Sequence, residues 1–328
     1  MNSSHAATFR DWVPIRFYRR GSEPYVDWCY MGSDRFTNPF FADTIRQRMR
    51  QPFNVLFRHQ TRIEFLRELT EVDAVIPPTG FIFHMSRCGS TLVAQMLASL
   101  SRNIVVSEAP PIDAILRLRT EGLADGTVSD WLTWMIHALG RRRIEAEKDF
   151  FIKFDSWNTL ELEFIRQVFP DVPWIFLYRL PLEVIVSHMR QRGSQMIPGA
   201  MGALLPELDL AKALRMPAEE YCAKLLAKIC AGALSFADDD NGLLVNYDQL
   251  PGAVTGVIAE HFGLSFSDEE METLNGAARY NAKTPQMFFE PDTAGKREEA
   301  TDAARQAAAT WTDPVYAEME AFRSNDPQ

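Results

Sequence analysis

The chain has 328 residues, of which 46% are hydrophobic and 24% are charged, so it can fill a sizeable core and is not disordered overall. Its length fits one large α/β domain, with or without an appended segment. The formal net charge of −10 argues against a nonspecific nucleic-acid binder, because such proteins need a basic surface that displaces counterions. A local basic pocket for one anionic ligand stays open.

The four cysteines, Cys29, Cys88, Cys222 and Cys230, form no CxxC pair and have no histidine cluster beside them. This pattern indicates reduced thiols, not a zinc site or a disulfide framework, and no metal is expected. The first 20 residues lack the apolar region of a secretory signal, and the longest apolar runs fall far short of the roughly 20 residues that span a bilayer. The sequence therefore predicts a cytoplasmic protein with no membrane or nucleic-acid partner.

The first segment of the chain, residues 1–75, shows no clear regular pattern at its start. Residues 12–41 are rich in aromatic residues, Gly, Pro and Asp without a clean period, which predicts irregular structure. Asn38 is expected to cap a helix with Pro39 in its first turn, and a further helix is expected at about 61–70. We interpret residues 1–75 as an appendage that packs on a main domain, residues 76–328. A lid or a dimer arm is the alternative.

In the main domain, short apolar runs alternate with helical patterns. The expected strands are 81–85, 103–107, 150–155, 174–178 and 243–247. The expected helices are 92–100, 112–148 with a break near 122–126, 159–168, 182–190, 217–237 and 252–262. The run 174–178 is continuously apolar, which is typical of a parallel strand that is covered on both faces. The alternation predicts an α/β fold with a three-layer, doubly wound, mainly parallel sheet and helical insertions.

The loop between the first predicted strand and its helix is the most informative segment, and it reads Ser86-Arg87-Cys88-Gly89-Ser90-Thr91. A buried strand that enters a glycine-bearing loop and then a helix makes an anion site, because the first helical turn has unpaired N–H groups and its dipole favours negative charge. Gly89 permits close approach of the backbone, Ser90 and Thr91 add hydroxyl donors, and Arg87 adds a fixed positive charge. The Walker A string GxxxxGK[ST] is absent, which disfavours an ordinary ATPase or kinase.

This loop resembles the 5′-phosphosulfate loop of the PAPS-dependent sulfotransferases, which share the P-loop fold. Arg87 stands where cytosolic members carry Lys and tyrosylprotein-type members carry Arg, and Cys88 stands where many members have Ser. The resemblance implies that 3′-phosphoadenosine-5′-phosphosulfate (PAPS) is the donor. It also implies that the donor is bound by Ser86, Arg87, Cys88, Gly89, Ser90 and Thr91.

A second segment, IFLYRLPLEVIVSHMRQRG, resembles the 3′-phosphate signature of the same family. Arg179 follows an apolar strand, Pro181 comes two residues later, and Ser187 stands eight residues after the arginine. Parallel sheets bind ligands at the carboxyl ends of their strands, where the loop 86–91 also lies. The resemblance implies that Arg179 and Ser187 bind one phosphate. A solvated arginine and a helix hydroxyl bonded to its own backbone are the alternatives.

A third segment, residues 278–299, resembles the family only loosely. The family uses a late basic loop to close over the 3′-phosphate, and the candidates here are Lys283, Lys296 and Arg297. The strict RKG form is absent, and a solvated charged loop is an equal alternative.

The catalytic base has two kinds of candidate. Glu108 follows the second predicted strand at its carboxyl end, and it resembles the Glu base of the tyrosylprotein and bacterial branches. Its alternative role is that of a carboxylate near the start of the next helix. His84, within the first strand, and His188, beside Ser187, are the histidine candidates, although a single His in such a place is usually structural.

Two further groups of the site follow from the needs of sulfuryl transfer. Charge on the moving group must be stabilised, and Arg87 with the loop amides can do this. Lys153 and Asp155 end the third strand on the same edge of the sheet. Lys153 is expected to bridge to the sulfuryl group or to hold the acceptor, or else to form an ion pair.

The expected function is transfer of a sulfuryl group from PAPS to a hydroxyl or amine of a small acceptor, with Glu108 as the general base. The alternatives are a magnesium-dependent P-loop kinase for a small molecule and a noncatalytic nucleotide-binding module. Residues 194–217 are rich in Met, Pro and Gly, which suits either an adaptable apolar lid near the acceptor or a connecting loop. The acceptor and the oligomeric state are not predicted.

Overall fold

The structure, a computed structural model, describes residues 9–72, 74–202, 204–282, 284–288 and 293–325. Its centre is a five-stranded sheet made of β4 (Gly80–His84), β5 (Asn103–Ser107), β6 (Asp149–Lys153), β7 (Trp174–Tyr178) and β8 (Gly242–Asn246). The strand order is β5-β6-β4-β7-β8, and all neighbouring pairs are parallel. All five predicted strands are confirmed to within two residues at each end.

Apolar burial explains why these segments form strands. Every residue of β4, β5 and β7 is buried, which requires helices on both faces of the sheet. In the core the rings of Phe83 and Phe154 are stacked, with their centroids 4.6 Å apart. The chain moves from β4 to β5 in one direction across the sheet and from β6 to β7 and β8 in the other. Right-handed crossovers therefore place helices on opposite faces, as predicted for a doubly wound fold.

Helices make up most of the remaining chain in the main domain. Between β4 and β8 these are α5 (Ser90–Ser99), α6 (Pro110–Leu116), η1 (Arg117–Arg119), α7 (Asp125–Leu139), η2 (Ser156–Glu161), α8 (Leu162–Val168), α9 (Pro181–Arg190), η3 (Ser194–Met196), α10 (Leu210–Arg215) and α11 (Ala218–Leu234). After β8 follow η4 (Tyr247–Gln249), α12 (Gly252–Thr255), α13 (Val257–His261), α14 (Asp268–Ala278), β9 (Tyr280–Asn281), β10 (Thr284–Phe288), α15 (Thr293–Glu298), α16 (Asp302–Ala307), the π-helical turn η5 (Ala308–Thr312) and α17 (Asp313–Asn325).

Three helix predictions need correction. The helix expected to reach residue 148 ends at Leu139, because a Cβ at Gly140 would lie 2.6 Å from the Ile76 carbonyl oxygen and the chain turns there toward β6. The helix expected at 252–262 is divided into α12 and α13 at Gly256, whose φ of −107° and ψ of −113° are not helical. The helix expected at 159–168 begins as the 3-10 turn η2.

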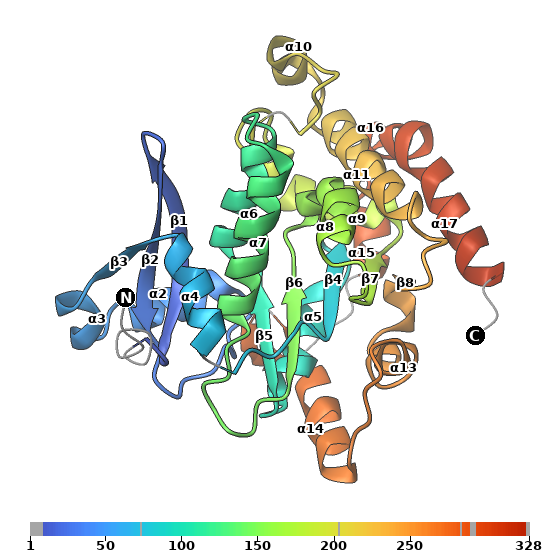
Figure 1. Ribbon diagram of the computed structural model, residues 1–328. Helices are drawn as coiled ribbons and strands as arrows, with labels where there is room; N and C mark the ends of the chain where they lie inside the picture. Colours follow the sequence, from blue (N-terminus) through green and yellow to red (C-terminus); the bar gives the residue numbers. More distant parts are fainter. Residues whose placement is uncertain (1–8, 73, 203, 283, 289–292, 326–328) are drawn as a thin grey trace.

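The prediction of irregular structure at residues 12–41 is wrong. β1 (Trp12–Arg20), β2 (Glu23–Tyr30) and β3 (His59–Arg62) form an antiparallel sheet in the order β1-β2-β3. A register shift between Pro14 and Arg16 interrupts the alternation, which explains why no clean period is visible. Figure 1 shows this sheet at one side of the molecule and α16 and α17 at the other.

The helix predictions in the same segment are also displaced. α2 (Phe41–Arg48) begins after Phe40, and Asn38 does not cap it but donates from Nδ2 to Thr44 Oγ1 at 3.1 Å. The helix expected at 61–70 begins only after β3, as α4 (Glu64–Val72). A short helix, α3 (Pro52–Leu56), precedes β3.

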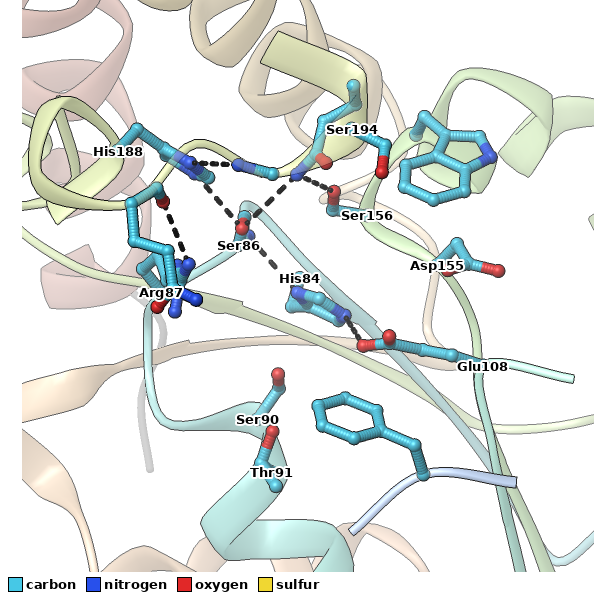
Figure 2. A pocket seen from close by; sticks show the side chains of 15 residues that line it. His84, Ser86, Arg87, Ser90, Thr91, Glu108, Asp155, Ser156, His188 and Ser194 are labelled. Carbon is cyan, nitrogen blue, oxygen red and sulfur yellow. Dashed lines mark hydrogen bonds and ion pairs between the residues drawn. The ribbon is translucent and has the colours of Figure 1, made fainter. Parts of the chain in front are cut away.

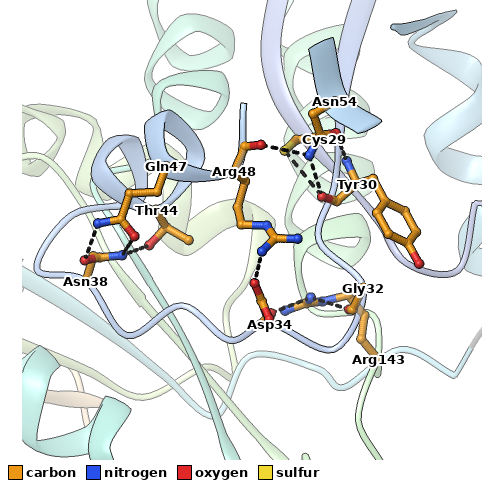
Figure 3. A network of polar contacts seen from close by, with 10 residues as sticks. All are labelled: Cys29, Tyr30, Gly32, Asp34, Asn38, Thr44, Gln47, Arg48, Asn54 and Arg143. Carbon is orange, nitrogen blue, oxygen red and sulfur yellow. Dashed lines mark hydrogen bonds and ion pairs between the residues drawn. The ribbon is translucent and has the colours of Figure 1, made fainter. Parts of the chain in front are cut away.

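A polar network holds the N-terminal segment together and joins it to the chain between α7 and β6. Figure 3 shows Arg143, which follows α7 and donates from Nη1 to the carbonyl oxygens of Gly32 at 3.1 Å and Asp34 at 2.8 Å. Arg48 forms an ion pair with the Asp34 carboxylate. Asn54 accepts from the Tyr30 N–H at 2.8 Å and donates back to the Tyr30 carbonyl at 2.9 Å. These contacts fix the segment in place; the domain boundary at residues 75 and 76 stays a prediction.

Within the part of the chain that the structure describes, none of the helices combines the length and apolar character needed to cross a membrane.

Candidate active site

A cavity of about 370 Å³ lies at the carboxyl ends of the central strands. Eight of the residues that the sequence analysis placed at the site line it, namely His84, Ser86, Arg87, Ser90, Thr91, Glu108, Asp155 and His188. Figure 2 shows Arg87 and His188 on one side of the cavity and Glu108 and Asp155 on the other. The sheet topology produces this arrangement, because the carboxyl ends of parallel strands share one edge.

Backbone strain is concentrated at this cavity. Among the residues that the structure describes, the non-glycine residues with positive φ are Ser86 at 83°, Arg87 at 52° and Glu108 at 54°, and all three line the cavity. Each such conformation costs about 1–3 kcal/mol and persists only where its surroundings hold it, which is characteristic of functional sites. Ser86 and Arg87 belong to the anion loop, residues 86–91, which leads into the N-terminus of α5.

Two residues of the anion loop shape it without facing the cavity. The Cys88 thiol is buried and donates to the Leu177 carbonyl at 3.0 Å, and burial raises the pKa of this thiol to about 11. Gly89 has a φ of 86°, and a Cβ there would lie 2.6 Å from Leu250 Cδ1 and 3.0 Å from Tyr247 Cδ2. Only glycine fits this position, because both the backbone angle and the close contact exclude a side chain.

The contacts of His84 fix which of its ring nitrogens carries the proton. The Ser86 N–H donates to Nδ1 at 3.1 Å, so Nδ1 is an acceptor and the neutral ring is protonated at Nε2. Nε2 lies 3.1 Å from the Phe154 carbonyl oxygen and 3.5 Å from Glu108 Oε1. Burial lowers the pKa of His84, opposed in part by its hydrogen bond to Glu108. His84 is therefore a neutral donor toward Glu108, and neither of its nitrogens is available to take a proton.

The Ser86 hydroxyl is oriented by two donors. His188 accepts from the Gly193 N–H through Nδ1 at 3.3 Å, so its Nε2 donates to Ser86 Oγ at 3.2 Å. Gln195 Nε2 also donates to Ser86 Oγ, at 3.4 Å. A hydroxyl oxygen that accepts twice keeps its own O–H as a donor. The arrangement therefore directs one hydroxyl proton of the anion loop toward a ligand.

Glu108 and Lys153 form an ion pair below the cavity. The Lys153 side chain is fully buried, and its ammonium donates to Glu108 Oε1, the same oxygen that faces His84. Burial acts to raise the pKa of Glu108, but the charge of Lys153 and the hydrogen bond from His84 outweigh it, so the pKa lies well below its usual range. The Lys153 ammonium also lies 5.2 Å from the centre of the Phe40 ring, which brings the N-terminal segment into the cavity wall.

The described residues among those expected at the 3′-phosphate lie beside α9, outside the cavity lining. Arg179 is buried, donates from Nε to Glu183 Oε2 at 2.6 Å and lies 4.0 Å over the Tyr247 ring. Arg297, on α15, donates to the other oxygen of Glu183 at 2.7 Å. Lys296 is buried and Ser187 is half-buried on α9. Lys283 lies outside the described residues. Arg179 and Arg297 are thus brought together by one buried carboxylate.

Sequence reasoning missed several groups of the site. Glu183, four residues after Arg179, carried a usable signal, because that spacing is typical of an ion pair on a helix. Gln195 and Ser194 line the cavity, although their segment was interpreted as a lid or connecting loop. Trp157 also lines it, and nothing in the sequence pattern marked it. Asp155 was placed on the active edge without a role.

Comparisons with solved structures return sulfotransferases. One is the sulfotransferase domain of the curacin biosynthetic pathway, with 15% identity, a TM-score of 0.41 and coverage of 76% of this chain and 98% of that one. Another is the sulfotransferase STF9 from Mycobacterium avium, with 14% identity, a TM-score of 0.46 and coverage of 81% of each chain. A third is a mouse sulfotransferase in complex with PAP, with 14% identity, a TM-score of 0.40 and coverage of 80% of this chain and 91% of that one.

The chain is similar to sulfotransferases of known structure. No family model and no curated protein matches its sequence. The similarities are distant ones between folds, and the case for a function therefore rests on the side chains of the site.

Proposed function

We propose that the protein transfers a sulfuryl group from PAPS to a hydroxyl or amine of a small acceptor. The observation that carries this proposal is the division of the cavity into two sides. Arg87 and His188, which orients the Ser86 hydroxyl, lie on one side, and the carboxylates Glu108 and Asp155 lie on the other. An anionic donor suits the first side, and an acceptor that loses a proton suits the second.

The donor groups of the site fit a phosphosulfate. Ser86 presents a hydroxyl proton, Ser90 and Thr91 add hydroxyls at the start of α5, and Arg87 adds a guanidinium. Helix N-termini and guanidinium groups both bind tetrahedral oxyanions. We assign these four residues to the 5′-phosphosulfate, and Cys88 and Gly89 to shaping the loop. Ser90 occupies the position where a Walker A loop has its lysine, which favours a sulfuryl donor over ATP.

The second part of the nucleotide site is assigned to the neighbourhood of α9. We propose that Arg179 and Ser187 bind the 3′-phosphate and that the late basic residues Lys283, Lys296 and Arg297 close over it. The shared contact of Arg179 and Arg297 with Glu183 supports this assignment, because it brings a residue of the second segment and one of the third to the same place.

The carboxylate side of the cavity supplies the remaining chemistry. The Lys153 ammonium forms an ion pair with Glu108, and the Nε2 proton of His84 faces the same carboxylate. We propose that this group stabilises charge beside the transferring sulfuryl. The acceptor proton then passes to a carboxylate on this side, where the sequence predicted Glu108.

The test is isothermal titration of the wild-type protein with adenosine 3′,5′-bisphosphate (PAP), and separately with ATP and magnesium. We expect metal-independent binding of PAP that Arg87→Ala and Arg179→Ala each weaken at least tenfold. Arg142→Ala is the matched control, because the Arg142 side chain is exposed and does not line the cavity. The backbone N–H of Arg142 donates to the Ala74 carbonyl ahead of β4, at the opposite end of the strands. Binding of ATP with magnesium, and none of PAP, would overturn the proposal and favour the kinase.

A further inference from the structure

A second cavity adjoins the first. It has a volume of about 570 Å³, and Trp157 lines both cavities. The indole is held in place, because Trp157 Nε1 donates to Asp113 Oδ1 at 2.6 Å. Asn158 Nδ2 donates to the same oxygen at 3.0 Å, and Arg117 Nε donates to Asp113 Oδ2 at 2.6 Å. A molecule in the second cavity would therefore approach the anion loop alongside the fixed indole of Trp157.

Asp155 lies two residues before Trp157 and lines the first cavity. Its backbone N–H donates to Asn158 Oδ1 at 3.2 Å, which fixes the turn at the end of β6. The Asp155 side chain takes part in the capping box of η2. An ionised carboxylate has about four lone-pair sites, so the hydrogen bond of the capping box leaves other sites of Asp155 that can accept a proton. Asp155 thus lines the first cavity and lies two residues from Trp157, which lines both cavities.

Glu108, the base expected from the sequence, is differently placed. Its Oε1 is engaged by the ammonium of Lys153 and faces the Nε2 proton of His84. A carboxylate paired with a buried ammonium is a weak proton acceptor, because protonation would leave Lys153 as an unpaired buried charge. This ion pair makes Glu108 better suited to fixing the buried Lys153 ammonium beneath the cavity than to taking a proton.

We propose that an acceptor seated in the second cavity gives its proton to Asp155, and that Glu108 positions Lys153. This inference rests on the proposed sulfuryl transfer. In the step, the acceptor O–H bond breaks and its proton moves to a carboxylate oxygen of Asp155. The acceptor oxygen bonds to sulfur, and the bond from sulfur to the phosphate oxygen breaks. The electron pair of that bond stays on the phosphate of PAP. An amine reacts in the same way through its N–H.

The charges around Asp155 agree with this role. Burial is the main influence, followed by the carboxylates of Glu108 at the end of β5 and Asp113 on α6, and together they raise the pKa of Asp155 well above its usual value. Lys153 on β6 and Arg117 on η1 oppose this shift. A base whose pKa lies nearer the working pH transfers protons more effectively than one whose pKa is very low.

The experiment measures release of PAP from PAPS, with water as the acceptor, for the wild type, Asp155→Asn and Glu108→Gln. We expect Asp155→Asn to bind PAP within threefold of the wild type, to slow its release by about 10²–10⁴-fold, and to lose the rise of rate with pH. Glu108→Gln should keep that rise. An Asp155→Asn rate within tenfold of the wild type, with the pH dependence lost in Glu108→Gln instead, would overturn the inference.

A second measurement needs no turnover. Infrared difference spectra between about pH 4 and about pH 8 should show a larger carbonyl band from protonated carboxyls in the wild type and in Glu108→Gln than in Asp155→Asn, because other carboxyls of the chain also titrate in this range. A band of equal area in Asp155→Asn and in the wild type would overturn the inference. Failure of the wild type to bind PAP would overturn the proposed function instead, so the two failures are distinguishable.

Discussion

Arg179 and Glu183 form a buried ion pair in which Nε of the arginine lies 2.6 Å from Oε2 of the glutamate, across the first turn of α9. The other carboxylate oxygen bonds Arg297 at 2.7 Å. Glu183 therefore neutralises one buried guanidinium and anchors a second, from a segment more than a hundred residues later in the chain. A carboxylate in this position orients both basic groups and fixes where their guanidinium planes lie.

Replacing Glu183 with glutamine should destabilise the protein. The change removes the Glu183 charge from a buried ion pair with Arg179, and breaking a buried pair typically costs about 3–5 kcal/mol. The free energy of unfolding in urea should fall by that amount, and PAP affinity should fall with it. Glu272→Gln, at an exposed position on α14, is the control and should change stability by less than about 0.5 kcal/mol. Equal effects of the two substitutions would contradict this role of Glu183.

The ion pair of Lys153 and Glu108 can be tested with a double-mutant cycle. Lys153→Met alone leaves the Glu108 charge without its buried partner, so stability should fall by about 3–5 kcal/mol. Adding Glu108→Gln to Lys153→Met should restore part of that loss, because no carboxylate charge then remains unpaired. The measurement is urea unfolding of the wild type, both single variants and the double variant. Additive single effects would show that the two side chains are not coupled.

The backbone of the anion loop gives a prediction about Gly89. Gly89→Ala forces a side chain onto a φ of 86° and against Leu250, at 2.6 Å, so it should destabilise the protein by at least about 1–2 kcal/mol and weaken PAP binding. Gly276→Ala is the control, since nothing lies within 4 Å of a Cβ at that position of α14. There alanine should stabilise by about 0.5–1 kcal/mol. The prediction is wrong if both substitutions change the melting temperature in the same direction.

The dependence of stability on pH should distinguish Asp155 from ordinary carboxylates. Its pKa is raised in the folded state, chiefly by burial, above the ordinary value of 3.8. Its favourable contribution is then complete below pH 3.8 and is lost as the pH rises through the folded pKa. Asp155→Asn should therefore be more stable than the wild type at about pH 8, and this advantage should shrink toward about pH 4.

Urea unfolding at both pH values provides the check, and asparagine keeps the ability to cap a helix. Asp171→Asn, at an exposed position before β7, is the matched control and should alter stability by less than about 0.5 kcal/mol at either pH. Lower stability of Asp155→Asn at both pH values would count against a half-buried Asp155 whose charge is unfavourable. Loss of activity together with a gain in stability is the combination that a purely structural residue would not give.

The sequence by itself determined the parallel sheet and the place of the anion loop. Both depend on local patterns: continuous apolar runs such as 174–178 cannot be solvated on either face, and the small residues of 86–91 separate a strand from a helix. Glu108 and Lys153 could be placed on the active edge for the same reason, because each follows or ends a predicted strand and parallel strands share a carboxyl edge.

Only the tertiary structure decided which side chains meet. The N-terminal sheet depends on pairing between β2 and β3, which are distant in sequence, and on a register shift that hides the strand period. The pairing of Glu183 with Arg297 and the placement of Trp157 between two cavities also join segments that no local pattern connects. Asp155 and Glu108 are both carboxylates at strand ends, and their opposite pKa shifts arise from burial and from the different charges packed around each. Hydrophobic periodicity specifies the elements, whereas long-range packing sets the electrostatic environment that separates a proton acceptor from an ion-pair partner.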